Sequence, residues 1–332
     1  MLHSDAVVED GQRHFGRFET TPLANPTQQY DGAARAWEWF RTKEWAGFTL
    51  SHPELFCSMI IQEAKYLASS ELYVFDCASQ ELVQHSANRM GGSLRLPADL
   101  LHSACAFTSP RYRLGYDFGD DEVIVAIDID ATPDAPAVRG RLHLDVRHAS
   151  HPLVVSSKLP GGSMYTNKIV YPASGRIYCG SRAYTFHPSR DFAILDEHKS
   201  HLPYRTRWTW GTFVFPVDGG IAGANFASRE SAPGQEEESC LWTPQAAEPL
   251  SDIAFERHGD DDRSPWTMRS ADGRLDVTFT PQGSKGVDQQ LVVAEIHYRQ
   301  WFGTYEGTLR GQDREWQIHG VHGACEQMDA RM

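Results

Sequence analysis

The chain of 332 residues has little of what marks a membrane, nucleic-acid-binding or secreted protein. No apolar run approaches the roughly 18 residues that span a bilayer, and the first residues lack the basic and apolar segments of a secretory signal. Only 31 basic residues, scattered along the chain, oppose 44 acidic ones, so the net charge is −13. That charge repels phosphate backbones and anionic lipid. We therefore expect a cytoplasmic protein that binds no nucleic acid and has no stable membrane insertion.

Motifs for cofactors and metals are also missing. The six cysteines lie far apart and form no Cys-x-x-Cys pair, which disfavours zinc and dithiol redox sites. The glycine pairs precede no helix with a Lys-Ser or Lys-Thr pair, so we expect no phosphate loop. His198-x-x-His201 and His319-x-x-His322 lack a third ligand at a diagnostic spacing. The sequence predicts an activity, if any, without cofactor or metal.

The sequence does contain several segments in which apolar residues recur at every second position. Val123, Val125, Ile127 and Ile129 would share one face of a strand, and residues 141–147 and 275–280 alternate in the same way. This alternation is typical of antiparallel strands buried on one side. Further strands are predicted at residues 55–62, 66–76, 168–171, 176–186, 207–217, 221–228 and 290–300. No strand–helix–strand alternation supports a Rossmann or TIM fold.

Helical and loop signals are few. Residues 33–45 have helical composition, and Ser189 could cap a short helix that runs to about Leu195. Residues 130–137 and 231–239 have the composition of loops. A chain of this length exceeds the usual size of one hydrophobic core, so we expect two domains.

The segment from Asp196 to Gly211 concentrates acids, bases, histidines and tryptophans in consecutive positions. It resembles a bacterial family of unknown function whose members carry Asp, a basic residue and then Pro-Tyr-Arg-Thr-x-Trp-x-Trp. The stretch Lys43-Glu44-Trp45 matches the same family, as does Phe302-Gly303-x-Tyr305-x-Gly307 followed by Gly320 and Glu326. At Ser200 and Leu202 the chain departs from the family, which usually has glycine and tryptophan there.

This resemblance implies a more distant kinship with carotenoid hydratases and with tandem-lipocalin Diels-Alder cyclases. Those proteins bind long apolar substrates in a barrel cavity without a redox cofactor. The implied fold is all-β, with two consecutive lipocalin-like antiparallel β-barrels. We place the first barrel at residues 1–185 and the second at residues 186–332. A likeness at the level of the fold transfers no reaction by itself.

The aromatic part of the segment should form one strand. If the strand begins at Tyr204, alternation places Tyr204, Trp208 and Trp210 on one face and Arg205 and Arg207 on the other. The aromatic face would suit a cavity for an apolar small molecule, and we predict that these rings bind substrate. The same rings could instead fill a solid core.

The polar part offers acid–base chemistry. Asp196, His198 and His201 supply a carboxylate and two imidazoles, the material for proton transfer near neutral pH. Arg205 or Arg207 could hold a nearby acid in a bidentate pair, or could stabilise negative charge that develops on a substrate. Histidines in such a segment can equally be solvated or hydrogen-bonded locally.

Glu63 is a further candidate for the substrate site. It follows an otherwise apolar strand, where it is either a buried acid with a raised pKa or the polar start of a turn, and we favour the turn. Two functions fit the whole pattern. One is a cofactor-independent lyase, isomerase or cyclase with hydratase-like chemistry on an isoprenoid, polyketide or fatty acyl derivative. The other is a binding or carrier protein for the same hydrophobic ligand.

Overall fold

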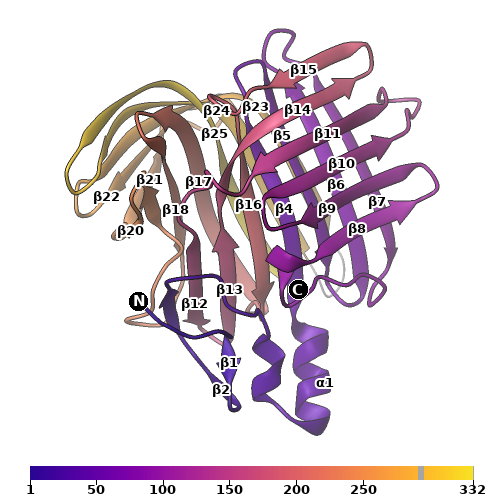
Figure 1. Ribbon diagram of the computed structural model, residues 1–332, viewed down its shortest axis with the longest axis vertical. Helices are drawn as coiled ribbons and strands as arrows, with labels where there is room; N and C mark the ends of the chain where they lie inside the picture. The colour runs from indigo at the N-terminus through magenta and orange to yellow at the C-terminus, as the bar shows by residue number, and fades with distance from the viewer. Residues whose placement is uncertain (291–294, 332) are drawn as a thin grey trace.

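The computed structural model describes residues 1–290 and 295–331. They form two large antiparallel sheets, one of 14 strands and one of 9, which lie side by side (Figure 1). One sheet curls into a nearly closed barrel and the other into a half-barrel, and these two lipocalin-like units, called barrels below, follow each other along the chain. The prediction of an all-β fold with two consecutive lipocalin-like barrels is confirmed.

The first sheet holds the strands up to Ser200. They are β3 (Gly16–Phe18), β4 (Lys43–Ser51), β5 (Leu55–Glu63), β6 (Leu67–Asp76), β7 (Leu82–Met90), β8 (Ala104–Ser109), β9 (Tyr112–Phe118), β10 (Glu122–Ile129), β11 (Val138–Asp145), β12 (Leu153–Leu159), β13 (Gly162–Lys168), β14 (Val170–Cys179), β15 (Arg182–Phe186) and β16 (Phe192–Ser200). The main path runs β7-β6-β5-β4-β16-β14-β11-β10-β9-β8, and β3, β12, β13 and β15 lie beside it.

The second sheet holds the remaining strands. They are β17 (Arg205–Val217), β18 (Gly220–Arg229), β19 (Cys240–Trp242), β20 (Ala247–Pro249), β21 (Ile253–Arg257), β22 (Trp266–Ser270), β23 (Leu275–Gln290), β24 (Glu295–Arg310) and β25 (Glu315–Arg331). Their order is β20-β19-β18-β17-β25-β24-β23-β22-β21. A separate hairpin of β1 (Val8–Glu9) and β2 (Gln12–Arg13) precedes both sheets.

The change from one sheet to the other falls between Ser200 and Arg205. Strand β16 therefore belongs to the first sheet, where it pairs with β4 from Phe192↔Ser51 to Ser200↔Lys43. The division of the chain into two folding units near residue 185 stays a prediction.

The short helix predicted from Ser189 to about Leu195 is wrong, because this stretch leads into β16. Phe192 and Ile194 pack in a cluster between the sheets, whereas Ala193 and Leu195 pack inside the first barrel. Burial on both faces produces an uninterrupted apolar run, whose period does not distinguish a strand from a helix.

Helix α1 (Gly32–Arg41) ends earlier than the predicted 33–45, since β4 begins at Lys43. None of the helices in the described part of the chain is long and apolar enough to cross a membrane. The predicted strand 176–186 is divided in the structure into the end of β14 and β15. The predicted strand 168–171 covers the last residue of β13 and the start of β14. Part of the predicted strand 290–300 lies outside the described residues; β24 begins at Glu295.

Both barrel interiors are filled by side chains. A large apolar cluster from β4 to β16 occupies the first barrel, and a second cluster around Trp266, Phe279 and Tyr305 occupies the second. A third cluster of buried side chains joins the two barrels. In it, the ring of Phe302 from the second sheet lies 5.5 Å from the ring of Phe56 and 4.4 Å from the ring of Phe75, both from the first sheet. The gap between the barrels is thus a packed interface.

The segment between the sheets is held close to β13. His201 and Ser163 exchange backbone hydrogen bonds of 2.8 and 2.9 Å. Gly162 permits this approach, because a Cβ atom there would collide with the carbonyl oxygen of His201. The contact fixes where the chain enters the second sheet and hence where β17 places its tryptophans.

Replacement of Phe302 with alanine should lower the free energy of unfolding by about 3–5 kcal/mol, because the variant leaves a cavity among buried rings. Urea denaturation measures the effect. Tyr178→Ala is the matched control, since that ring is 42% exposed and should contribute little. Equal unfolding midpoints for Phe302→Ala and the wild type would contradict the packed interface.

Candidate functional site

The two barrels enclose a small polar cavity between them. On β16, Asp196 and His198 share the face that looks toward the second sheet, whereas Glu197 and Lys199 lie on the opposite face. The cavity has a volume of about 30 Å³. Its lining comes from both sheets and comprises Trp45, Lys168, Asp196, His198, Leu202, Trp208, Trp210, Arg229, Glu238 and Glu326.

Lys168, on β13, is the central cation. Its ammonium lies 2.6 Å from Oδ1 of Asp196 and 3.4 Å from Oε2 of Glu238, and it lies over the ring of Trp210 at 5.2 Å. His198 bridges the same carboxylates, with Nε2 at 3.3 Å from Asp196 and 3.5 Å from Glu238. One buried cluster therefore combines two carboxylates, a lysine and an imidazole.

Trp45 fixes the orientation of this cluster. It lies directly opposite His198 on the neighbouring strand β4, and the two rings stack at 4.3 Å with an interplanar angle of 19°. Its indole Nε1 donates a hydrogen bond of 3.2 Å to Oδ2 of Asp196. The carboxylate and the imidazole are thus positioned by one indole.

The charges hold one another in their ionised forms. Burial by itself raises the pKa of Asp196. The charges of Lys168 and His198 lower this pKa by a larger amount, so the net pKa lies below its usual range. Burial likewise opposes ionisation of Glu238, and Arg229 and Lys168 overcome it, so its pKa is also depressed. Burial lowers the pKa of His198, but Asp196 and Glu238 raise it above its ordinary value. The two carboxylates thus favour the imidazolium form of His198.

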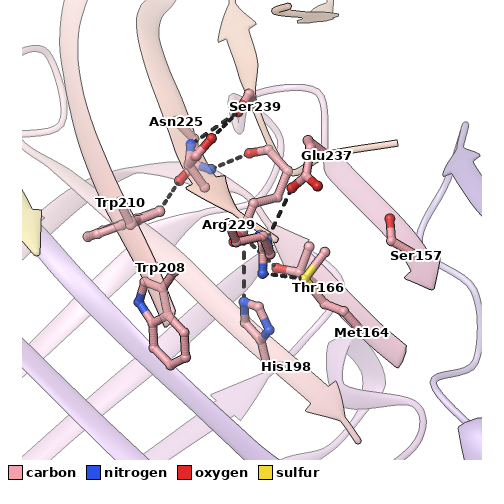
Figure 2. A network of polar contacts seen from close by, with 12 residues as sticks. Ser157, Met164, Thr166, His198, Trp208, Trp210, Asn225, Arg229, Glu237 and Ser239 are labelled. Carbon is pink, nitrogen blue, oxygen red and sulfur yellow. Dashed lines mark hydrogen bonds and ion pairs between the residues drawn. The ribbon is translucent and has the colours of Figure 1, made fainter. Parts of the chain in front are cut away.

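Arg229, at the end of β18, balances the acids of the second sheet. Its Nε contacts Oε2 of Glu237 at 3.1 Å, and its Nη2 pairs with Glu238. Figure 2 shows Arg229 between Glu237 and His198, with the sulfur of Met164 beside it. These contacts place a guanidinium next to the lysine and imidazole from the first sheet.

Glu326, on β25, is a different kind of acid. Its carboxyl accepts hydrogen bonds from Trp208 Nε1 at 2.8 Å, Tyr298 OH at 2.8 Å and Gln300 Nε2 at 3.0 Å. Burial raises its pKa, the negative charge of Asp196 adds to the rise, and the hydrogen bonds from Trp208 and Tyr298 oppose it. The net pKa of Glu326 is raised, whereas the pKa values of Asp196 and Glu238 are lowered.

Four of the predicted residues, Asp196, His198, Trp208 and Trp210, line the cavity together. Both tryptophans lie between the barrels and not inside one. His201 lies outside the cavity, where its ring nitrogens contact Oγ1 of Thr42 at 2.6 Å and Oε2 of Glu38 at 2.8 Å. Burial, with nearby arginines, lowers the pKa of His201 to about 4. The pKa values of the two histidines of the motif are thus shifted in opposite directions.

Arg205 and Arg207 do not hold the acid of the cavity as predicted. Both are exposed, because strand alternation turns them to the outer face of β17. Arg207 pairs instead with Asp329, its cross-strand neighbour, at 2.8 Å. Tyr204 precedes the strand, which begins at Arg205, and is 58% exposed. The cation that pairs with Asp196 is Lys168, whereas the sequence predicted Arg205 or Arg207 for this contact.

Glu63 is buried at the end of β5, away from the cavity. Its Oε1 accepts a hydrogen bond from the backbone of Lys65 at 2.6 Å, and its Oε2 accepts one from Leu94 at 3.1 Å. Lys65 has a positive φ of 74°, so the carboxylate stabilises a tight turn. The contacts agree with the turn that the sequence favoured, and a role in substrate binding stays a prediction.

Several functional residues were missed from the sequence. Lys168 ends an unremarkable strand, Arg229 stands in no motif, and Glu238 closes an acidic run that has loop composition. Trp45 and Glu326 belong to the stretches that carry the family resemblance, and that resemblance was the only available signal for them.

A larger cleft adjoins the cavity, with a volume of about 530 Å³. Trp208 and Arg229 line both spaces and separate them. The cleft combines apolar surface from Trp208, Tyr298 and Met328 with charged groups such as Arg299. Its size falls in the range of about 300–1,000 Å³ typical of small-molecule sites. Within residues 1–290 and 295–331, no group of three or more His, Cys, Asp or Glu side chains is arranged to hold a metal ion.

Fold and site together define a tandem lipocalin-like protein with a charged cavity between its barrels. The family model described as Domain of unknown function (DUF2804) matches residues 20–332. The chain belongs to this family. Among curated proteins, none matches the sequence.

Solved structures are similar in fold. CghA solved with Sch210972 is 10% identical with a TM-score of 0.55, over 86% of this chain and 87% of that one. CghA in a second structure is 12% identical with a TM-score of 0.52, over 88% of each chain. Kievitone hydratase from Nectria haematococca is 8% identical with a TM-score of 0.51, over 98% of this chain and 96% of that one. At these identities the likeness shows the fold alone.

Lys168→Met should lower the free energy of unfolding by about 3 kcal/mol, because it leaves Asp196 and Glu238 without their shared cation in a largely buried place. Arg207→Met is the matched control. Its ion pair with Asp329 is exposed, and such pairs contribute little. Urea denaturation of both variants measures the difference. An equal effect of the two substitutions would show that Lys168 does not compensate the buried acids.

Glu197 should make stability depend on pH. Burial raises its pKa from 4.5 to about 7, against the effects of Lys199 and Asn167. Between these two values the unfolded chain releases the proton while the folded chain keeps it, so stability falls as the pH rises across the window and is constant above it. Glu197→Gln should remove this decline in urea midpoints, and the exposed Glu230→Gln should not. An unchanged slope in Glu197→Gln would contradict the raised pKa.

Proposed function

We propose that the protein is a cofactor-independent enzyme that adds water to, or removes water from, a small organic substrate at the cavity between the barrels. One observation carries this proposal: the cavity pairs an acid with a raised pKa, Glu326, with an ionised acid, Asp196. Carboxyls whose environments push their pKa values apart act as the acid and the base of one site. The fold of kievitone hydratase agrees with this class of reaction.

The size of the cavity favours a reaction of water over an isomerisation or cyclisation. A volume of about 30 Å³ exceeds the roughly 10–15 Å³ that a cavity needs to hold a water molecule. Asp196, Lys168, His198 and Glu326 supply the two to four polar partners that a bound water needs. A whole substrate does not fit there, so its reacting end alone would reach this space.

The roles follow from the protonation states. In hydration, Glu326 donates its proton to a carbon of the substrate double bond, and a water oxygen forms a bond to the other carbon. Asp196 accepts the proton that this water loses, while Lys168 and His198 hold the carboxylate in place. The proton then passes from Asp196 to Glu326, which restores both groups. Dehydration is the same sequence reversed.

The substrate body would lie in the adjoining cleft. Trp208 and Tyr298 offer aromatic surface, whereas Arg299 and His297 offer hydrogen-bond donors. This mixture suits a lipophilic molecule that also carries oxygen substituents, such as an isoprenoid, polyketide or fatty acyl derivative. Trp208 and Arg229 would have to move for its reacting end to enter the cavity.

A carrier protein for the same kind of ligand is the second candidate. The charged groups of the cavity are already paired with one another, which is what a purely structural network requires. In that case the cleft alone would bind the ligand, and no proton would be transferred.

Glu326→Gln should lower turnover by about 10²- to 10⁴-fold, the usual cost of losing a proton-transfer group. The purified protein is incubated with an extract of lipophilic metabolites in water enriched in a heavy oxygen isotope, and mass spectrometry identifies products that have gained labelled water or lost water. Wild-type activity should fall as the pH rises through the raised pKa of Glu326, because the reaction needs the acid form.

Glu197→Gln is the matched control, because it changes a buried glutamate on the opposite face of β16. It should keep full activity. If no compound of the extract gains labelled water or loses water with the wild type or any variant, while the wild type still retains a ligand from the extract, the carrier function is correct. If Glu326→Gln keeps full activity, the acid is another residue.

A further inference from the structure

One end of the first barrel carries an unusual density of exposed aromatic side chains. None of the ten residues of α1 is buried, and Trp37, Trp39 and Phe40 are 59%, 46% and 44% exposed. Trp37 and Phe40 stack on each other at 6.2 Å with an interplanar angle of 26°. Figure 1 shows α1 projecting below the two barrels. A helix with this composition would normally bury its rings against the protein.

Neighbouring strand ends extend this surface. Tyr66 is 53% exposed beside β6, Leu67 is 42% exposed, and Met90, its cross-strand partner on β7, is 82% exposed. The ammonium of Lys65 lies 5.0 Å above the ring of Trp39, which joins the turn before β6 to α1. These side chains, Trp37, Trp39, Phe40, Tyr66, Leu67 and Met90, are called the aromatic patch below.

The accessible charges around the aromatic patch are mostly positive. Arg35 is exposed, and Arg41 and Lys43 are half-buried at its edge. Among the nearby carboxylates, Asp31, which directly precedes α1, is exposed, whereas Glu38 and Glu44 have side chains only 14% and 15% exposed and each contacts a basic residue. Burial and the charges of Lys65 and Arg41 lower the pKa of Lys43 to about 8. A negative partner would relieve this crowding of cations.

We propose that the aromatic patch docks the protein on the surface of a bilayer that contains anionic lipid. Aromatic rings combined with arginine and lysine are the composition that binds the interface between headgroups and acyl chains. A second protein molecule would need no cationic rim. The overall charge of −13 does not prevent docking, because at physiological salt a charge acts over only about 8 Å and the local cations decide.

The docking helix is also connected to the segment that joins the barrels. Glu38 and Thr42, at the end of α1, both contact the ring of His201, and the next residue, Leu202, lines the cavity. The cavity in turn shares Trp208 and Arg229 with the cleft. Docking of α1 would hold the protein, and with it the cleft, at the bilayer surface, where lipophilic molecules accumulate.

The test is sedimentation of the purified full-length protein with lipid vesicles. One preparation contains phosphatidylcholine alone, and the other contains phosphatidylcholine with phosphatidylglycerol. The protein should sediment with the second preparation and bind more weakly as salt is added, because screening weakens the attraction. The measurement needs no activity, so it can fail or succeed independently of the proposed reaction.

Two sets of variants separate the contributions. Trp37→Ala combined with Phe40→Ala should abolish sedimentation, and Tyr178→Ala combined with Leu82→Ala, which removes exposed apolar side chains elsewhere, should not. Arg35→Gln should weaken binding to the anionic vesicles by about fivefold, the effect of one cation near a charged surface. Arg113→Gln, an exposed arginine on β9, is its control. All six substituted positions are exposed, and equal urea midpoints will verify that each of the four variants folds.

Three results would overturn the proposal. The first is no sedimentation with either preparation, and the second is sedimentation that the Trp37→Ala and Phe40→Ala pair leaves unchanged. The third is a dimer, detected by analytical ultracentrifugation without lipid, that this pair of substitutions dissociates. That result would assign the aromatic patch to contact between two copies of the chain.

Discussion

The buried charges between the barrels are the constraint on which the rest of the structure depends. Lys168, Asp196 and His198 come from the first sheet, whereas Arg229 comes from the second and Glu238 from the loop between β18 and β19. Removing a single charge from water costs several kcal/mol unless a partner of opposite sign is placed beside it. Neither barrel contains the full set of partners. Docking of the barrels and assembly of the site are therefore one event, and the cluster specifies how the two sheets face each other.

Asp196 and Glu326 are both buried, but their pKa values shift in opposite directions because their partners differ. Asp196 faces the ammonium of Lys168, and the attraction exceeds the cost of burial, so its proton is lost easily. Glu326 faces mainly neutral donors, the indole of Trp208 and the phenol of Tyr298, which do not compensate for burial. A full positive charge stabilises a carboxylate more than a neutral donor does. The division between acid and base is thus set by which strand carries the lysine.

The sequence allowed prediction of the fold and of one wall of the site. Period-two alternation identified strands buried on one side, and the family resemblance pointed to two barrels. Asp196, His198, Trp208 and Trp210 were found because they share a short segment. Strand β16 was misassigned in part because both its faces are buried. Lys168 could not be found, because its contact with Asp196 joins positions 28 residues apart on strands that only the fold brings together. The outward direction of Arg205 and Arg207 could not be predicted either, because it depends on the pairing of β17 with its neighbours.

Because side chains fill the interiors of both barrels, the proposed chemistry is placed between the barrels. Access to the cavity then depends on Trp208 and Arg229, which separate it from the cleft, and both are bonded to its acids. If a ligand displaced Trp208, Glu326 would lose a donor that favours its ionised form, and its pKa would rise further. If it displaced Arg229, Glu238 would lose its strongest cationic partner, and its pKa would also rise. Opening the wall therefore shifts both acids toward the protonated state. In the proposed reaction, substrate entry and the supply of a proton would therefore be coupled through the same two side chains.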